Sequence, residues 1–276
     1  MQGLRRATLA CLAVFSLAGS ANAAVQLRAT TAPDPSSRET VAETLVLHSD
    51  ALGRDVTVDV TAPPNPVATG KAAAVYVLDR GMLITGQSAR ILERSGVMGP
   101  AFIVSISTTD TGANRNFDFV HERIGQGKDA WGGGGEAYET FVVDELKPFI
   151  EARYPVDPAR SVLFGHSLGG LFAATVLVRH PQAFSGYLLA SPSIWATPAL
   201  IQAVRQMPPL SRPVRVFIGY GETEGLGLIG PARQFSEALA AQHTALEVRE
   251  KAFEGLNHMS SFLMEGPAAL PFLLPP

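Results

Sequence analysis

The stretch SVLFGHSLGG, residues 161–170, decides the fold of this chain. It contains the pattern G-x-S-x-G with Ser167 at its centre, preceded by the apolar run SVLF and followed by the helix-periodic segment LGGLFAATVLVRH. The five-residue pattern alone is weak evidence. A strand, a tight turn and a helix in this order, however, are the arrangement that a nucleophile elbow requires. The context therefore predicts a nucleophilic serine at position 167, with a structural turn as the alternative.

Apolar runs and helix-periodic segments alternate on both sides of this motif. Alternating residues in two neighbouring runs, 43–49 and 55–61, predict an antiparallel hairpin. Continuous apolar runs predict buried strands at 73–78, 101–107, 161–164, 187–190 and 214–220. Helices are predicted at 136–153, 168–180, 199–207 and 231–243, and Pro148 is expected to kink the first or end it early. The fold class is α/β, with a mostly parallel central sheet, helices on both faces and one domain at 43–276.

A serine nucleophile needs a general base, and His258 is the best candidate among the histidines. It lies late in the chain, in a loop after a strand-like run, which matches the chain order serine, acid, histidine of α/β hydrolases. His166 is the neighbour of Ser167, but successive side chains of a tight turn point in different directions. The remaining histidines lie in an early strand, an upstream loop or at helix ends: His48, His121, His180 and His243.

The acid that would orient His258 must be a glutamate, because the chain has no aspartate after Asp157. The segment GYGETEG, residues 219–225, follows a predicted strand at the carboxyl edge of the sheet, where such sites are built. Glu224 stands three residues after Gly221, the usual offset for the acid, and is preferred. Glu222 remains the alternative.

The next residues, 225–230, spell G-x-G-x-x-G before a helix, which is the pattern of a dinucleotide-binding turn. The context disfavours that function, because an acidic loop separates the glycines from their strand. No acid follows at the end of a next strand to bind a ribose. A flexible loop beside the catalytic acid is the preferred interpretation.

The N-terminus has the pattern of an export signal. Arg5 and Arg6 precede an apolar run at 9–18, and Ala21-Asn22-Ala23 ends it with small residues. This predicts a signal peptide at 1–23, cleaved after Ala23, and a periplasmic or secreted protein. Polar residues 24–42 predict a flexible arm.

Composition excludes several function classes. Cys11, the single cysteine, lies within the predicted signal, so the mature chain would carry neither disulfide nor thiolate. Cleavage would leave 20 basic against 25 acidic residues, a net charge of −5, which argues against nucleic-acid binding. No later apolar run reaches about 18 residues, so stable membrane insertion after cleavage is not expected.

Several segments together resemble one known family. They are VYVLDRG at 75–81, RNFDFV at 115–120, the run from DELKPF to SPSIW at 144–195, and FEGLNHMSSF at 253–262. The chain resembles bacterial esterases of the esterase D-like superfamily, and within it the periplasmic esterases of enterobactin-type trilactone siderophores. The resemblance covers about residues 43–270 and implies an α/β-hydrolase fold with Ser167 as nucleophile and His258 as base.

The resemblance also implies an oxyanion hole and substrate contacts. Its backbone donors would be Leu168 and, from the LDRG loop, Gly81 or Met82. Arg80 interrupts the family's usual Leu-Asp-Gly sequence, and Phe119-Val120 replaces its usual Thr-Pro. Arg80, Arg115 and Trp195 are candidate substrate contacts, with surface or core roles as the alternatives.

These observations predict a serine esterase that cleaves small carboxylic esters through an acyl-enzyme and requires neither metal nor cofactor. An acyltransferase on the same scaffold and a non-catalytic binding protein are the alternatives. The oligomeric state and the physiological ester do not follow from the sequence.

Overall fold

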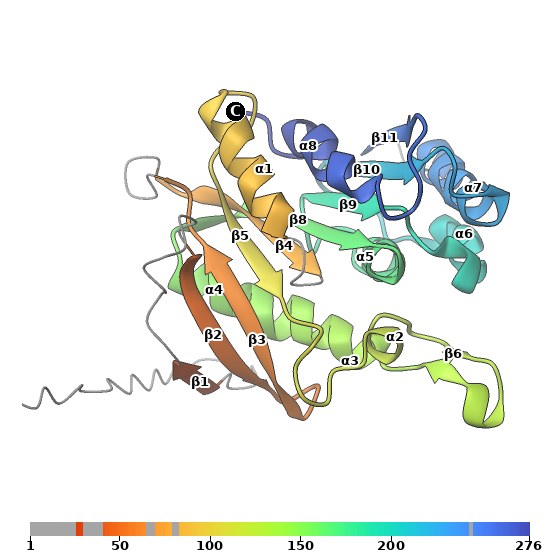
Figure 1. Cartoon of the computed structure of the whole chain (residues 1–276), viewed down its shortest axis with the longest axis horizontal. Helices are drawn as coiled ribbons and strands as arrows, with labels where there is room; N and C mark the ends of the chain where they lie inside the picture. Colours follow the sequence, from red (N-terminus) through yellow and green to blue (C-terminus); the bar gives the residue numbers. More distant parts are fainter. Residues whose placement is uncertain (1–25, 30–40, 65–69, 79–82, 243–244) are drawn as a thin grey trace, which may run out of the picture.

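The computed structural model describes residues 26–29, 41–64, 70–78, 83–242 and 245–276 (Figure 1). Among these residues, nine strands form one sheet in the order β1-β2-β3-β5-β4-β8-β9-β10-β11. The strands are β1 (Gln26–Ala29), β2 (Val41–Ser49), β3 (Arg54–Thr61), β4 (Ala72–Leu78), β5 (Ala101–Ile106), β8 (Val156–His166), β9 (Gly186–Ala190), β10 (Val214–Gly221) and β11 (Leu246–Phe253).

The sheet is antiparallel at one end and parallel through the rest. The predicted hairpin is confirmed, because β2 and β3 pair antiparallel, and β3 pairs antiparallel with β5. From β5 to β11 all neighbours are parallel. At the N-terminal end, β1 pairs antiparallel with β2, so part of the segment expected to be a flexible arm is an edge strand. The predicted signal peptide lies outside the described residues.

Helices cover both faces of the sheet, which is the predicted α/β arrangement (Figure 1). Residues of β4 alternate between two hydrophobic clusters, because successive strand side chains point to opposite faces. Val75 and Val77 pack with Ala89 of α1 and Leu270 of α8, whereas Tyr76 packs with residues of α3 and α5. The principal helices are α1 (Leu83–Arg94), α3 (Gly135–Thr140), α4 (Lys147–Arg153), α5 (Leu168–Arg179), α6 (Ala199–Ala203), α7 (Leu226–Gln242) and α8 (Phe262–Leu273).

The helical segment around Pro148 differs from its prediction. A π-helical stretch, Phe141–Leu146, joins α3 to α4, and the helix continues to Arg153. Pro148 is the second residue of α4 and comes directly after the π-helical stretch, inside a continuous helical segment. The wider π turn lets the chain pass the proline without ending the helix there.

Two further segments bear on function. The glycine-rich residues 226–230 form the first turns of α7, so the prediction of a flexible loop there was wrong. Between β5 and α3 the chain makes an excursion containing the short helix α2 (Arg115–Asp118) and the two-stranded ribbon of β6 (Arg123–Ile124) and β7 (Trp131–Gly132). Within the part of the chain that is described, no helix is long and apolar enough to cross a membrane.

Candidate active site

Ser167 occupies a strained turn between β8 and α5. Its φ of 59° and ψ of −117° put it in a region that non-glycine residues rarely adopt. A Cβ atom at Gly165 would lie 2.0 Å from the carbonyl oxygen of Gly169, so only glycine permits this crossing of strand and helix. The turn holds the serine side chain at the carboxyl edge of the sheet, as a nucleophile elbow requires.

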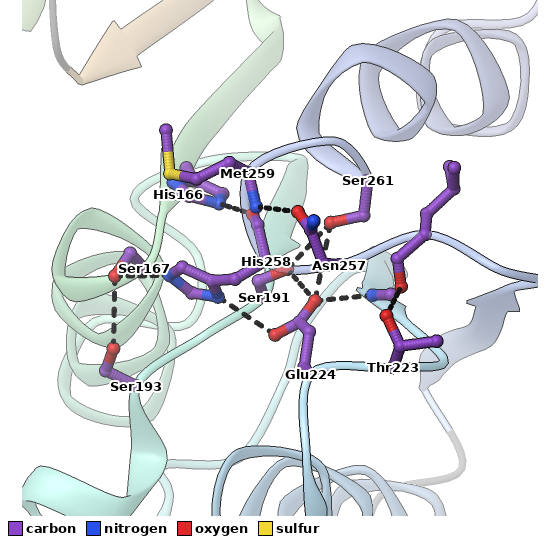
Figure 2. A network of polar contacts seen from close by, with 12 residues as sticks. His166, Ser167, Ser191, Ser193, Thr223, Glu224, Asn257, His258, Met259 and Ser261 are labelled. Atoms are coloured by element: carbon purple, nitrogen blue, oxygen red, sulfur yellow. Dashed lines mark hydrogen bonds and ion pairs between the residues drawn. The ribbon is translucent and has the colours of Figure 1, made fainter.

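Three side chains from three loops form one hydrogen-bonded chain at this edge (Figure 2). The Nε2 atom of His258 lies 3.0 Å from Ser167 Oγ, and its Nδ1 atom lies 2.9 Å from Glu224 Oε2. A carboxylate can only accept, so Nδ1 carries the proton and Nε2 is free to accept from the serine hydroxyl. This is the arrangement in which a histidine can remove the proton of an attacking serine.

Glu224, and not Glu222, contacts His258. The Glu224 side chain is 1% exposed and also accepts hydrogen bonds from Ser191 and the backbone N–H of Gly221. Burial disfavours its charge, but the hydrogen bonds from His258, Ser191 and Gly221 outweigh burial and lower the pKa of Glu224. Glu222 instead accepts from the N–H of Gly255. Of the two glutamates, Glu224 is therefore the one positioned to orient the His258 ring.

His166 contacts the back of the site rather than the serine hydroxyl. Its Nε2 donates to the carbonyl oxygen of His258 at 2.9 Å, and the two imidazole rings lie 4.7 Å apart (Figure 2). The exclusion of His166 as the base agrees with this geometry. Its role in anchoring the His258 loop could not be read from the sequence, since it depends on a contact 92 residues away.

The predicted oxyanion donors are only partly described. Leu168 is the first residue of α5, and N–H groups in the first turn of a helix have no carbonyl acceptor within that helix. Such N–H groups, with the helix dipole behind them, favour a negative charge. Gly81, Met82 and Arg80 lie outside the described residues.

The other two predicted substrate contacts, Arg115 and Trp195, belong to the described part of the chain. Arg115 donates from Nη2 to the carbonyl oxygen of His166 at 2.9 Å, and its guanidinium lies over the Phe119 ring. Arg115 therefore supports the backbone of the elbow. Trp195 is 45% exposed and lies in the short 3₁₀ helix at 194–196 that follows Ser193.

Sequence analysis missed four polar side chains around the triad. Ser193 Oγ lies 3.3 Å from Ser167 Oγ, and Ser191 Oγ lies 2.6 Å from Glu224 Oε1 (Figure 2). Both belong to the segment SPSIW, whose serines were available as a signal. Two further residues lie at the start of α8: Ser261 contacts Glu224, and Glu265 contacts Ser191. Neither residue gave a signal in the sequence.

A second polar cluster lies at the far end of α5. The carboxylate of Glu139 accepts from His121, Arg179 and His180, each at 3.0 Å. Beside it is a cavity of about 350 Å³. Its lining includes Leu171, Thr175, Arg179, His121, Leu200 and Ala203.

Comparison with known proteins gives the family. The family described as "Putative esterase" matches residues 49–262, more than half of the chain. The chain belongs to this esterase family. It is 29% identical over 260 residues to the ferri-bacillibactin esterase BesA of Bacillus subtilis, which covers 85% of this chain and 90% of the relative. It is also 32% identical over 160 residues to the siderophore enterobactin esterase of Emericella nidulans, covering 51% of this chain and 53% of the relative.

A solved member of similar structure confirms the fold. The BES protein of Bacillus cereus superposes with a TM-score of 0.78 at 26% identity, covering 89% of this chain and 99% of the other. The predicted family and the α/β-hydrolase fold are therefore confirmed. As a member of the esterase family, the protein is a carboxylic ester hydrolase.

Proposed function

We propose that Ser167, His258 and Glu224 are the catalytic triad of this esterase. The observation that carries the proposal is the continuous hydrogen-bonded chain from Ser167 Oγ through the His258 ring to the buried Glu224 carboxylate. His258 Nε2 takes the serine proton as Oγ attacks the ester carbonyl, and the charged imidazolium that forms is stabilised by Glu224. His258 then returns the proton to the leaving alkoxide oxygen, which departs as the alcohol.

The N–H of Leu168 is one donor to the oxyanion of the tetrahedral intermediate, with Gly81 or Met82 as the second. Removal of one oxyanion donor typically costs on the order of 10²- to 10³-fold in rate. The ester bond breaks to leave an acyl group on Ser167. Water, deprotonated by His258, attacks that acyl group. The bond to Ser167 Oγ breaks, His258 returns the proton to Oγ, and the acid is released.

The proposed substrates are small-molecule esters of the siderophore type. Support comes from the similarity to two relatives, a ferri-bacillibactin esterase and a siderophore enterobactin esterase. Arg80, Arg115 and Trp195 are proposed to contact the substrate. A panel of trilactone siderophores, short aryl esters and acylated sugars tests the substrate class. A preference for aryl esters or acylated sugars over trilactones would contradict the siderophore proposal.

The nucleophile is tested by covalent labelling with a fluorophosphonate. We expect one adduct on the wild-type protein, none on Ser167→Ala and an adduct again on Ser193→Ala, which keeps the triad. Ester hydrolysis by Ser167→Ala should fall about 10⁶-fold. An adduct or full activity in Ser167→Ala would exclude Ser167 as the nucleophile.

We also propose that the protein is exported, with residues 1–23 removed after Ala23. Support comes from the sequence pattern: Arg5 and Arg6, then the apolar run at 9–18, then the small residues at 21–23. The test is the intact mass of the protein recovered from the periplasmic or culture fraction, which should correspond to a chain that starts at Ala24. Protein that keeps Met1 and stays in the cytoplasm would overturn it.

A further inference from the structure

A second carboxyl group lies directly behind the triad. Glu265 on α8 is 0% exposed, and its Oε1 atom lies 3.1 Å from Ser191 Oγ. The same Ser191 oxygen lies 2.6 Å from Glu224 Oε1, so one hydroxyl bridges two carboxyl groups. The space for Glu265 exists because residue 219 is glycine, whose Cβ would lie 2.9 Å from Glu265 Cγ.

The protons of this bridge can be counted. Ser191 has one hydroxyl proton, and its shorter contact, to the ionised Glu224, takes it. Ser261 Oγ lies 3.3 Å from Glu224 Oε1 and 3.2 Å from Ser191 Oγ, and it also hydrogen-bonds to Glu265, so its one proton is shared between the two carboxyl groups. The contact between Ser191 and Glu265 then requires a proton on Glu265. A neutral Glu265 donates to Ser191, which in turn donates to Glu224.

The surroundings of Glu265 favour the neutral acid. Burial, with the nearby charge of Glu224 adding to it, raises the pKa of Glu265 to about 8. Its Oε2 atom is buried without a hydrogen-bond partner among the described residues, which costs a neutral acid less than a carboxylate.

Other charged groups near α8 are engaged elsewhere. His258 is bonded to the far oxygen of Glu224, and α8 packs on α1 and the sheet through apolar side chains. Most charged residues of the neighbouring elements pair with each other, with Glu247 or with aromatic rings: Arg90, Glu93, Arg215, Arg249 and Lys251. His166 packs against Phe262 of α8 and donates to the His258 carbonyl oxygen, and Arg94 is the last residue of α1.

We propose that Glu265 is a positioning residue, a neutral acid that donates its proton to Ser191 and so keeps the Ser191 hydroxyl directed at Glu224. The inference rests on the proposed catalytic role of Ser167, His258 and Glu224. If Glu265 loses its proton, two carboxylates compete for the single proton of Ser191 and repel each other. Glu224 is then held less firmly on His258, and activity falls on the alkaline side.

The test is the pH profile of kcat/KM for a short aryl ester, corrected for spontaneous hydrolysis. We expect the wild type to lose roughly tenfold or more between pH 7 and pH 10, because a group required in protonated form titrates there. Glu265→Gln, which stays neutral and keeps a donor, should be close to wild type at pH 7 and lack the alkaline fall. Glu265→Leu, which has no donor, should be about tenfold slower at every pH.

The controls separate positioning from folding. Glu145→Gln removes another buried carboxyl, far from the triad, and should keep the wild-type profile. Ser191→Ala combined with Glu265→Leu should be no slower than the worse single variant, since both break one bridge. An alkaline fall that persists in Glu265→Gln, or Glu265→Leu with full activity, would overturn the inference. If Ser167→Ala stays active, the proposed triad itself fails.

Discussion

Ser167 and Glu224 show how single residues set the chemistry of this site. Ser167 adopts a positive φ that is tolerated because Gly165 has no side chain to strike the Gly169 backbone. Glu224 places its carboxylate in a buried position, where four donors surround it: His258, Ser191, Ser261 and the Gly221 N–H. A charge held in this way can stabilise an imidazolium without rearrangement.

At this scale we expect Glu224→Gln to lower kcat about 10⁴-fold, because an amide stabilises neither the required tautomer nor the imidazolium. Glu222→Gln is the matched control, two residues away and bonded only to the loop at Gly255, and should leave kcat unchanged. The measurement is steady-state hydrolysis of a short aryl ester. Equal rates for both variants and the wild type would mean that Ser167 and His258 act as a dyad.

At the scale of the elements, a cluster of polar contacts links α3 to the end of α5. Glu139 of α3 bonds His121 of the preceding excursion and Arg179 at the end of α5. Burial opposes the charge of Glu139, yet hydrogen bonds from His121 and Arg179 hold its pKa below the usual value. The ion cluster therefore ties three segments that are distant in the chain.

We expect Glu139→Gln to lower the free energy of unfolding at pH 7 by about 1–3 kcal/mol. A carboxyl with a lowered pKa stabilises the fold above its unfolded pKa, and this contribution disappears as pH falls through the folded pKa. The Tm difference between wild type and Glu139→Gln should thus shrink below pH 4.5. Glu136→Gln, whose carboxyl is 82% exposed beside the same Arg179, should melt like the wild type throughout. A gap that stays constant with pH would contradict the charge-based account.

On the scale of the whole molecule, the sheet brings the loops of the triad to one edge. β8, β9, β10 and β11 follow one another as parallel strands, so their carboxyl ends lie at one edge of the sheet. Residues 91 and 34 positions apart in the sequence therefore meet there. α8 covers the face of the sheet opposite to the one covered by α3, α4 and α5. It packs there on α1 and β10 (Figure 1). The site therefore depends on a helix that follows His258 in the chain.

We expect a chain that stops after Ser261 to lose its cooperative thermal unfolding transition. It lacks Leu270, Leu273 and Leu274, each at most 3% exposed, and burial of one leucine contributes about 1.5–3 kcal/mol. The sum is comparable with a typical net stability of about 5–15 kcal/mol. Removal of Pro276 alone is the control and should leave Tm unchanged. A cooperative transition near the wild-type Tm in the shortened chain would show that α8 is dispensable for folding.

The sequence predicted the elements well where burial has a simple period. The apolar runs at 73–78, 187–190 and 214–220 are β4, β9 and β10 to within one residue at each end. Pro148 misled the helix prediction, because local propensity does not anticipate a π turn. The prediction of a loop at 226–230 was also wrong, because Gly227 and Gly230 lie in the first turns of α7 despite the low helix propensity of glycine.

Periodicity and turn chemistry are local, so the chain alone specified an α/β sheet, the elbow at Ser167 and a late loop histidine at 258. The contact of Glu224 rather than Glu222 with His258 depended on the direction in which one loop leaves β10. So did the bond from His166 to the His258 backbone and the bridge from Ser191 to Glu265. Such contacts join segments up to 92 residues apart, and their geometry exists once the strands and helices have packed.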